Sequence, residues 1–542
     1  MIEQNSNNFQ LTLKSKSNLF DFRSLMDLFH LSIDHYKDKV AYSCHNKELS
    51  FNDIDRLSRD FAAYLQSNLN IDQGERVGLM CPNTLAFPIA MWGIIRIGAV
   101  QVNINPSYTA NELQHQINDA QVDTIVILSS STTVLADIQE QTNIKNIIIV
   151  SIDDFLKGGQ HSPLIDNRLT KTINFTDALK CGYELDVNEP TIYSHDLVFL
   201  QYTGGTTGLS KGAMLTHGNV LANVLQYSEF NSQRIAYETE VVVTAIPMYH
   251  IFALTVNTLC YFFYGAKNIL ISDPKNSELF VQAWQENKVT FFTGVNTLFN
   301  SLLHVESFKK LDFSSLKLTI GGGAPVQEAV AKKWLELTGI KLSEGYGLSE
   351  TSPVLTLNIS DNNSAITGIG KPLPLTEISL RDDKGIIVAQ GESGELCAKG
   401  PQVMLGYWQN PNATKEVMTD DGFFKTGDIA FLDDQSHYHI VDRKKDMILV
   451  SGFNVFPNEI EAVLADLYGI FESACVGVPD EKTGEAVQAF IVRTASDITE
   501  KTVIDHCRTK LSAYKVPKVI NFVSELPKST VGKILRRELR AS

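Results

Sequence analysis

Apolar and polar positions follow two different periods along the first part of the chain. Apolar residues recur every three or four positions over 25–36 and 54–64, which is the spacing of an amphipathic helix. A further helical stretch covers 89–97. Short apolar runs, typical of buried strands, lie at 76–80, 100–104, 124–128, 146–150 and 197–200. This alternation predicts an α/β fold of mainly parallel sheets covered by helices.

The alternation returns in the middle of the chain and brings polar sequences to the ends of strands. Apolar runs at 241–245, 268–272, 290–293 and 316–320 are predicted strands. Residues 247–250 (Pro-Met-Tyr-His) follow the first of these runs, and 321–325 (Gly-Gly-Gly-Ala-Pro) follow the last. Ligands of open α/β sheets bind beyond the carboxyl ends of the strands, so we expect a binding site there.

The pattern of apolar and polar residues changes after residue 366. Short β-like runs alternate with glycine, proline and aspartate up to about residue 442, which predicts a small β-rich part. Beyond it, helical stretches at 457–467 and 503–511 accompany extended runs at 474–478 and 486–493. This indicates a compact α+β unit of a common domain size. A chain of 542 residues is too long for one core, so more than one domain is expected.

Composition and charge exclude several classes of protein. Hydrophobic residues make up 44% and charged residues 20% of the chain, an ordinary globular composition. The formal net charge of −15 argues against a general nucleic-acid-binding protein. None of the seven cysteines has CxxC spacing, so no zinc site is expected.

No targeting or membrane-spanning segment is predicted. The N-terminus lacks an apolar signal core, and the apolar stretch 246–271 is interrupted by polar residues. Scattered cysteines suit reduced thiols. We therefore expect a cytoplasmic protein, while peripheral contact with the inner face of the cell membrane and a homodimeric state are left open.

The stretch 202–212, Tyr-Thr-Gly-Gly-Thr-Thr-Gly-Leu-Ser-Lys-Gly, follows a predicted buried strand. Glycines let backbone N–H groups approach an anion, and hydroxyls and a lysine can bind phosphate oxygens. The nucleotide P-loop requires Gly-Lys-Ser/Thr, which this stretch lacks. A flexible surface turn is the alternative, and it fits poorly beside a buried strand. We interpret the stretch as a phosphate-binding loop of Thr203, Gly204, Gly205, Thr206, Thr207, Gly208 and Lys211.

A second informative stretch, 345–351, reads Gly-Tyr-Gly-Leu-Ser-Glu-Thr. The ring of Tyr346, between Gly345 and Gly347, can stack on a purine. Ser349 offers a hydroxyl, and Glu350 is a hard oxygen ligand of the kind that holds Mg²⁺ together with phosphates. On these residues alone, a turn with a solvated glutamate is an equal alternative.

Three weaker signals lie elsewhere in the chain. Asp428, in a Thr-Gly-Asp triplet, can accept two hydrogen bonds from a ribose diol, although such a triplet is usually only a turn. A single histidine such as His250 is more often structural than catalytic. The basic stretch 527–537, Pro-Lys-Ser-Thr-Val-Gly-Lys-Ile-Leu-Arg-Arg, by itself indicates solubility or contact with an anionic surface.

Taken together, these stretches resemble the adenylate-forming superfamily, which includes acyl-CoA synthetases, luciferases and the adenylation domains of peptide synthetases. The motifs follow the superfamily's order over roughly residues 25–540. Four stretches resemble more specifically the bacterial long-chain fatty acid–CoA ligases: 248–254, 400–408, 440–461 and 515–539. The resemblance implies an N-terminal AMP- and acyl-binding domain over 1–442 with its β-rich part at 366–442, a hinge at 443–446, and a mobile C-terminal domain at 447–542.

The resemblance also implies roles for single residues. Lys533 matches the mobile catalytic lysine, whose charge stabilises the phosphorus under attack. His250 matches a residue that guards the carboxylate and helps the thioester step. Ser349 stands where the superfamily has threonine, and its hydroxyl is kept. The remaining roles are Thr203 and Glu350 for magnesium; Gly322, Gly323 and Ala324 for adenine; Asp428 and Arg443 for ribose; Lys445 as hinge; Ser451, Gly452 and Phe453 on the CoA side; and Val295 and Thr297, which could equally be core, for an acyl tunnel.

The activity implied is ATP-dependent ligation of a long-chain fatty acid to CoA through an acyl-adenylate, with Mg²⁺ and with release of AMP and pyrophosphate. The partners are thus a fatty acid, ATP and CoA, and no nucleic acid. A fatty acyl-AMP ligase and an aryl or coumarate-type CoA ligase are the alternatives within this superfamily; a light-emitting oxidase is remote. A non-catalytic binding protein would predict lesions at Lys533, Glu350 or Asp428, which are all intact. A phosphotransferase would release ADP instead of AMP.

Overall fold

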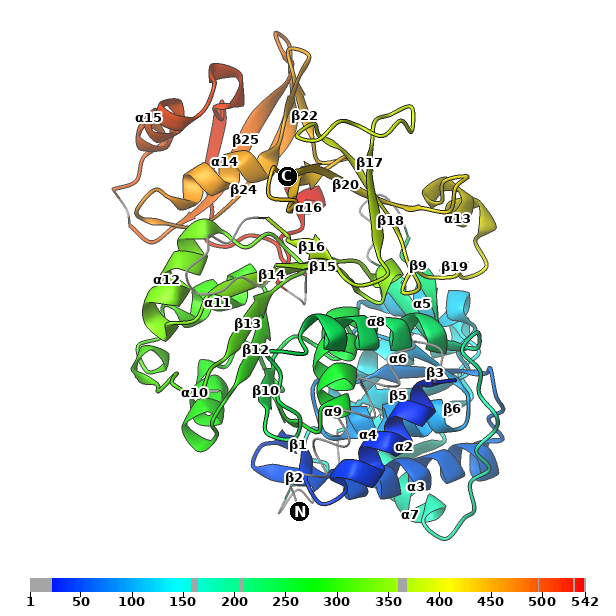
Figure 1. The fold of residues 1–542 in the computed structure, drawn as a ribbon. Coiled ribbons are helices and arrows are strands. Elements are labelled where there is room, and N and C mark those ends of the chain that lie inside the picture. The colour runs from blue at the N-terminus through cyan, green and yellow to red at the C-terminus, as the bar shows by residue number, and fades with distance from the viewer. Residues whose placement is uncertain are drawn as a thin grey trace.

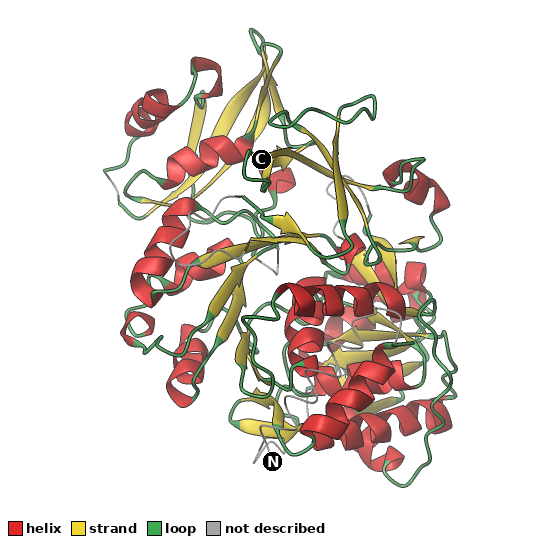
Figure 2. Cartoon of the chain, viewed as in Figure 1, coloured by secondary structure: helices red, strands yellow, loops and turns green. Residues whose placement is uncertain are grey.

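The computed structural model describes residues 22–156, 164–203, 209–358, 368–495, 497–529 and 532–540. These residues form a large part built on two mainly parallel sheets, a small antiparallel sheet, and a C-terminal unit with a sheet of its own (Figure 1). Helices cover the strands of the large part, as Figure 2 shows. The C-terminal unit, orange to red in Figure 1, lies above the large part.

One large sheet has eight strands among the described residues, in the order β19-β9-β8-β4-β3-β5-β6-β7. Six neighbouring strands, from β8 to β7, run parallel, whereas β9 is antiparallel to both β8 and β19. The bounds are β3 Arg76–Met80, β4 Val100–Asn103, β5 Thr124–Leu128, β6 Asn146–Val150, β7 Thr172–Asn174, β8 Leu197–Thr203, β9 Lys211–Thr216 and β19 Gly406–Tyr407.

The other large sheet has nine strands among the described residues, in the order β16-β15-β14-β13-β12-β10-β11-β1-β2. Its central strands are parallel, and antiparallel strands close both edges. The bounds are β1 Val40–Cys44, β2 Lys47–Ser50, β10 Val241–Thr244, β11 Lys267–Leu270, β12 Phe291–Gly294, β13 Leu318–Gly321, β14 Leu342–Gly347, β15 Val354–Asn358 and β16 Lys371–Pro372.

Three helices of the large part, α3, α5 and α8, begin at capping boxes. The side chains of Ser50, Thr109 and Thr216 each accept a backbone N–H three residues later, within capping boxes. The helices are α2 Leu25–Tyr36, α3 Phe51–Leu69, α4 Ala86–Arg96, α5 Ala110–Ala120, α6 Thr132–Ile138, α7 Phe175–Gly182, α8 His217–Phe230, α9 Tyr261–Phe263, α10 Ser277–Glu286, α11 Asn296–Leu302 and α12 Glu328–Thr338, with a π-helix at Ala253–Cys260 and 3₁₀ turns at Ser129–Ser131, Gln139–Gln141, Phe308–Lys310 and Ser349–Thr351.

A buried aromatic cluster joins helices that cover the two large sheets. The rings of Phe29 on α2 and Trp92 on α4 lie 4.6 Å apart, and Phe262 on α9 lies 5.3 Å from Trp92. All three side chains are buried, so the hydrophobic effect fixes these helices against each other. The two sheets therefore form one body around this core.

The small sheet and the C-terminal unit follow in sequence. The small sheet has the order β17-β18-β20-β21, with α13 Pro411–Val417 beside it, and the C-terminal sheet has the order β23-β22-β25-β24, with β26 paired to β25. The bounds are β17 Glu377–Arg381, β18 Gly394–Lys399, β20 Phe424–Leu432, β21 Tyr438–Arg443, β22 Ile448–Val450, β23 Phe453–Val455, α14 Pro457–Ala465, β24 Ile470–Asp480, β25 Gly484–Arg493, α15 Glu500–Lys510, a 3₁₀ turn at Ala513–Lys515, β26 Val519–Phe522 and α16 Arg536–Arg540.

The predicted α/β fold is confirmed, and most of the predicted strands and helices lie within two or three residues of their expected bounds. The sequence did not predict the hairpin of β1 and β2 or helix α5. The apolar stretch 246–271 folds into a π-helix, a short α-helix and a strand. None of the helices in the described residues combines the length and the apolar composition that crossing a bilayer requires.

Candidate active site

A cavity of about 1510 Å³ lies where both large sheets, the small sheet and the C-terminal unit meet. Its lining includes the ends of β8, β9 and β14, the strands β20 and β21, and residues of the C-terminal segment. The structure thereby brings together predicted site residues from distant parts of the chain. They are Thr203, Lys211, His250, Val295, Gly322, Gly323, Ala324, Gly345, Tyr346, Gly347, Ser349, Glu350, Asp428, Arg443, Lys445 and Lys533.

The predicted phosphate-binding loop connects β8 and β9, in which Thr203 pairs with Lys211. Gly204, Gly205, Thr206, Thr207 and Gly208 lie outside the described residues. After them, the carbonyl of Ser210 accepts a 2.8 Å hydrogen bond from Nε2 of His115 on α5. The two ends of the loop are thus held by the antiparallel pairing of β8 and β9 and by a hydrogen bond from helix α5.

Glu350 lies in the 3₁₀ turn after β14 and is buried. Its Oε1 accepts a 2.8 Å hydrogen bond from the hydroxyl of Tyr407, and the ring of Tyr407 lies 5.1 Å from the ammonium of Lys211. Burial raises the pKa of Glu350, while the bond from Tyr407 acts in the opposite direction. Tyr407 therefore links the lysine of the loop to the carboxylate.

The residues predicted for ribose form a connected group. Asp428 on β20 pairs with Arg443 on β21, whose Nε lies 3.1 Å from Oδ1 of Asp428. Oδ2 of Asp428 accepts a 2.6 Å bond from the hydroxyl of Tyr346. Burial and the charge of Asp428 raise the pKa of Tyr346 well above its usual value, so the hydroxyl keeps its proton. The ring of Tyr346 is thereby fixed by its hydroxyl at one end and by β14 at the other.

Lys533 enters the cavity from the C-terminal unit. Burial lowers the pKa of Lys533 to about 7. Among nearby charges, Arg443 acts in the same direction and Asp428 opposes it. The ammonium of this lysine thus lies within electrostatic reach of the Asp428–Arg443 pair, although 90 residues separate it from Arg443 in the sequence.

His250 follows β10, as the sequence predicted for a strand end. Burial, with the charge of Lys533 adding to it, lowers the pKa of His250 to about 4, so the ring is neutral at pH 7. Its Nδ1 accepts the backbone N–H of Phe252 at 3.3 Å. The proton of the neutral ring is therefore on Nε2.

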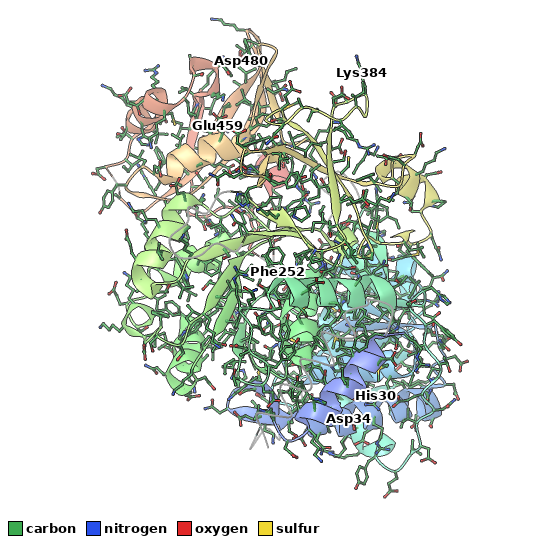
Figure 3. All side chains as sticks on the ribbon, viewed as in Figure 1. His30, Asp34, Phe252, Lys384, Glu459 and Asp480 are labelled. Atoms are coloured by element: carbon green, nitrogen blue, oxygen red, sulfur yellow. The ribbon has the colours of Figure 1, made fainter. Side chains whose placement is uncertain are left out.

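Part of the cavity lining is apolar. Phe252, labelled in Figure 3, lies in the interior of the molecule. The apolar lining comes from strand ends, from the π-helix and from the segment that precedes it. It includes Ile246, Ile251, Phe252, Val256, Val295 and Ile320.

Of the predicted residues that the structure describes, four lie outside the cavity lining. The hydroxyl of Thr297 donates a 3.1 Å hydrogen bond to the carbonyl of Gly532, next to Lys533. Ser451 and Gly452 form the turn between β22 and β23. Phe453 is 56% exposed and stacks on Tyr514 with a ring distance of 4.8 Å. The predicted CoA side of the C-terminal unit therefore does not face the cavity in this arrangement.

Tyr407 and Glu344 are two of the lining residues that were not predicted from the sequence. Tyr407 lies within the stretch 400–408, which had been used only to identify a branch of the superfamily. Glu344 lines the cavity, and burial raises its pKa to about 7, while the N–H of Val326 donates to Oε1 at 3.2 Å. Its position directly before Gly345 was the available signal.

Magnesium fits the donor set around Glu350. Mg²⁺ is usually held by one or two carboxylates, with substrate phosphates and water completing the shell. Within the described ranges, no group of three or more His, Cys, Asp or Glu side chains could hold a metal by itself. Glu350 offers one buried carboxylate in the cavity that Thr203 and Lys211, at the base of the predicted phosphate-binding loop, also line, and this arrangement suits a nucleotide-bound ion.

Two family profiles match the chain. The profile of the family described as AMP-binding enzyme covers residues 29–408, and that of the AMP-binding enzyme C-terminal domain covers residues 459–533. The first contains the phosphate-binding loop and Glu350, and the second ends at Lys533. Both matched segments thus contribute residues to the lining of the cavity.

Individual relatives are similar over nearly the whole chain. A long-chain-fatty-acid–CoA ligase of Escherichia coli O6:H1 is 46% identical over 545 residues, covering 98% of this chain and 97% of that protein. A 4-coumarate-CoA ligase 1 of Narcissus pseudonarcissus is 31% identical, covering 92% and 89%. The crystal structure of ATP-bound MatB from Rhodopseudomonas palustris has a TM-score of 0.82 at 28% identity, covering 95% of this chain and 98% of that one.

Proposed function

We propose, since the chain belongs to the AMP-binding enzyme family, that it ligates a long-chain fatty acid to CoA with ATP, through an acyl-adenylate. One observation carries the proposal: the base of the phosphate-binding loop, Glu350, Asp428 and Lys533 line a single cavity that also has an apolar wall. A nucleotide and an alkyl chain can therefore meet at one point.

Nucleotide binding uses groups that already have fixed orientations. Lys211 and the loop would hold the phosphates. Asp428 keeps free lone pairs for the ribose hydroxyls, because each of its oxygens has a single partner among the residues that the structure describes. Gly323 has φ of 76°, and a Cβ there would lie within 4 Å only of Cγ1 of Val295, at 3.8 Å, so its backbone can approach the adenine.

Adenylate formation is a displacement at the α-phosphorus. A carboxylate oxygen of the fatty acid attacks the α-phosphorus, and the bond from phosphorus to the bridging oxygen breaks, giving acyl-adenylate and pyrophosphate. The ammonium of Lys533 would stabilise the negative charge on the oxygens in the transition state. Because its pKa is lowered by burial, bound phosphates are needed to keep it protonated above pH 7.

Thioester formation requires a different arrangement of the C-terminal unit. The sulfur of CoA attacks the acyl carbon, the bond to the phosphate oxygen breaks, and AMP leaves with that electron pair as the thiol loses its proton. The Nε2–H of His250 would donate to the acyl oxygen. Rotation about Lys445 would withdraw Lys533 and bring the exposed face around Phe453 to the entrance.

Magnesium would be held by Glu350 and Thr203 together with the phosphates of ATP. Bound Mg²⁺ supplies charge neutralisation of the phosphates. Glu350 must then be ionised, and the hydroxyl of Tyr407 favours that form of the carboxyl.

The choice of acid rests on similarity and on the cavity wall. Identity to a long-chain-fatty-acid–CoA ligase, 46%, exceeds identity to a 4-coumarate-CoA ligase, 31%. Branched aliphatic side chains in the wall, such as Ile246, Val256 and Ile320, suit an alkyl chain better than a polar phenol.

Release of AMP, measured with Mg·ATP across acids of increasing length and with coumarate, tests the proposal. We expect AMP release that depends on CoA and is fastest with long-chain acids. Release of ADP would indicate a phosphotransferase, and adenylate that accumulates without reacting with CoA would indicate an acyl-AMP ligase. Activity with coumarate alone would assign the aryl class.

A further inference from the structure

The peptide group between Gly532 and Lys533 is held at both ends by hydrogen bonds. Its carbonyl oxygen accepts the hydroxyl of Thr297 at 3.1 Å, and its N–H donates to Oγ of Ser529 at 3.2 Å. Ser529 belongs to the C-terminal unit, whereas Thr297 lies in the first turn of α11 in the large part. The backbone that carries Lys533 is therefore fixed from two separate parts of the protein.

The approach of Thr297 to this peptide requires a glycine. Gly532 has φ of 79°, which lies in the left-handed region. A Cβ at this position would lie 2.6 Å from Oγ1 of Thr297 and 3.1 Å from Cγ2 of Val295. Gly532 therefore allows a close contact that a side chain would prevent.

Helix α11 makes a second contact with the C-terminal unit on the same side. Nδ2 of Asn300 donates a 3.1 Å hydrogen bond to the carbonyl of Phe471 on β24, and the rings of His304 and Phe471 lie 5.3 Å apart. Thr297 and Asn300 are three residues apart, so their side chains share one face of the helix. Through that face, α11 contacts the C-terminal unit in the arrangement in which Lys533 lines the cavity.

We propose that Thr297 is a positioning residue for adenylate formation, which it serves by holding the Gly532–Lys533 peptide so that the lysine reaches the α-phosphate. The proposal rests on the proposed function. A lysine ammonium sits on a flexible four-carbon stem, so its placement depends on a fixed backbone. The thioester step requires the C-terminal unit to leave this contact, so the hydroxyl of Thr297 acts in the first half-reaction only.

The test compares Thr297→Val, which keeps the shape but removes the hydroxyl, with Thr297→Ser, which keeps the hydroxyl. Adenylate formation is measured by pyrophosphate exchange with palmitate, and thioester formation by conversion of supplied palmitoyl-adenylate with CoA. We expect Thr297→Val to lower exchange by about five- to tenfold, the effect of one lost hydrogen bond. Thioester formation should stay at the wild-type rate, and Thr297→Ser should behave as wild type in both assays.

Equal loss of both half-reactions in Thr297→Val, or an unchanged exchange rate, would overturn the proposal. If Thr297→Val does not fold, Gly532→Ala is the second variant to measure, because its Cβ would clash with Oγ1 of Thr297. We expect Gly532→Ala to lower pyrophosphate exchange and to leave thioester formation unchanged. Lys533→Ala separates this inference from the function: normal exchange in that variant would refute the role of the lysine itself, whereas normal exchange in Thr297→Val alone would refute only the positioning.

Discussion

The hydroxyl of Tyr407 donates a 2.8 Å hydrogen bond to Oε1 of Glu350, 57 residues earlier in the sequence. The ring of the same tyrosine lies 5.1 Å from the ammonium of Lys211. One side chain thus touches both the carboxylate expected to bind the metal and the lysine expected to bind phosphate. Tyr407 is on β19, which pairs with β9, so the sheet itself holds this arrangement.

Tyr407→Phe should weaken the affinity of the enzyme for magnesium at a fixed pH. Without the hydroxyl, the buried carboxyl of Glu350 loses the bond that lowers its pKa, so its ionised form becomes less favourable. We expect the magnesium concentration for half-maximal pyrophosphate exchange to rise by about fivefold. Tyr438→Phe removes a tyrosine hydroxyl outside the cavity lining and should leave this concentration unchanged.

Lys533→Ala should separate the two half-reactions. Loss of a charge that stabilises the transition state costs on the order of a hundredfold or more in rate. We expect pyrophosphate exchange to fall by that factor, while thioester formation from supplied acyl-adenylate continues. Lys510→Ala, which removes a lysine paired with Asp466 on the surface, serves as control. Exchange at the wild-type rate in Lys533→Ala would contradict the proposed role.

The pH dependence of kcat/KM for ATP should report the lysine in the free enzyme. Lys533 has a pKa lowered to about 7, so it loses its positive charge as the pH rises through that value. We expect kcat/KM to decline above about pH 7 for this reason. In Lys533→Arg the charge persists, so the decline should disappear even though the overall rate is lower. If kcat/KM declines at the same pH in the wild type and in Lys533→Arg, the decline is caused by a group other than Lys533.

Asp428→Asn should impair both folding and ATP binding. The change removes the negative charge of the carboxylate, which pairs with Arg443 and accepts a hydrogen bond from the hydroxyl of Tyr346. A hydrogen bond to a charged group contributes about 2 kcal/mol, so we expect a loss of that order in the free energy of unfolding by urea.

The KM for ATP in the same variant should rise at least about tenfold, because ribose loses its acceptor as well. Asp433→Asn, which removes the partner of His439 at the far end of β21, is the control and should leave this KM unchanged. An unchanged KM in Asp428→Asn would show that ribose does not depend on this carboxylate.

The periodicity of the sequence was sufficient for the elements with a strong pattern. Strand Arg76–Met80 and helix Leu25–Tyr36 were predicted with their observed bounds, because one is a continuous apolar run and the other places Leu25, Phe29, Ile33 and Tyr36 on a single face. Helix α5 was missed, because only part of its surface is buried and polar residues dominate its sequence. The start of this helix depends on the capping box at Thr109.

The sequence predicted part of the cavity lining, but it did not predict the contacts between the lining residues. Tyr346 was expected to offer a ring to the base, and the structure adds that its hydroxyl is held by Asp428. Thr297 was expected in a tunnel wall, and its hydroxyl instead contacts the loop of Lys533. Local sequence patterns could not predict either contact, because the partners are 82 and 235 positions apart in the chain.

The sequence by itself determined the class of fold, the order of the elements and the chemical groups available for phosphate, ribose and metal. These follow from local patterns of apolar residues, glycines and hydroxyls, which act over a few positions. Only the tertiary structure decided that Lys533 shares a cavity with Asp428 and Glu350, and which protein groups hold each of them. The reason is physical: electrostatic reach and desolvation depend on distance and burial in space, and burial is created by packing between segments that are far apart in the chain.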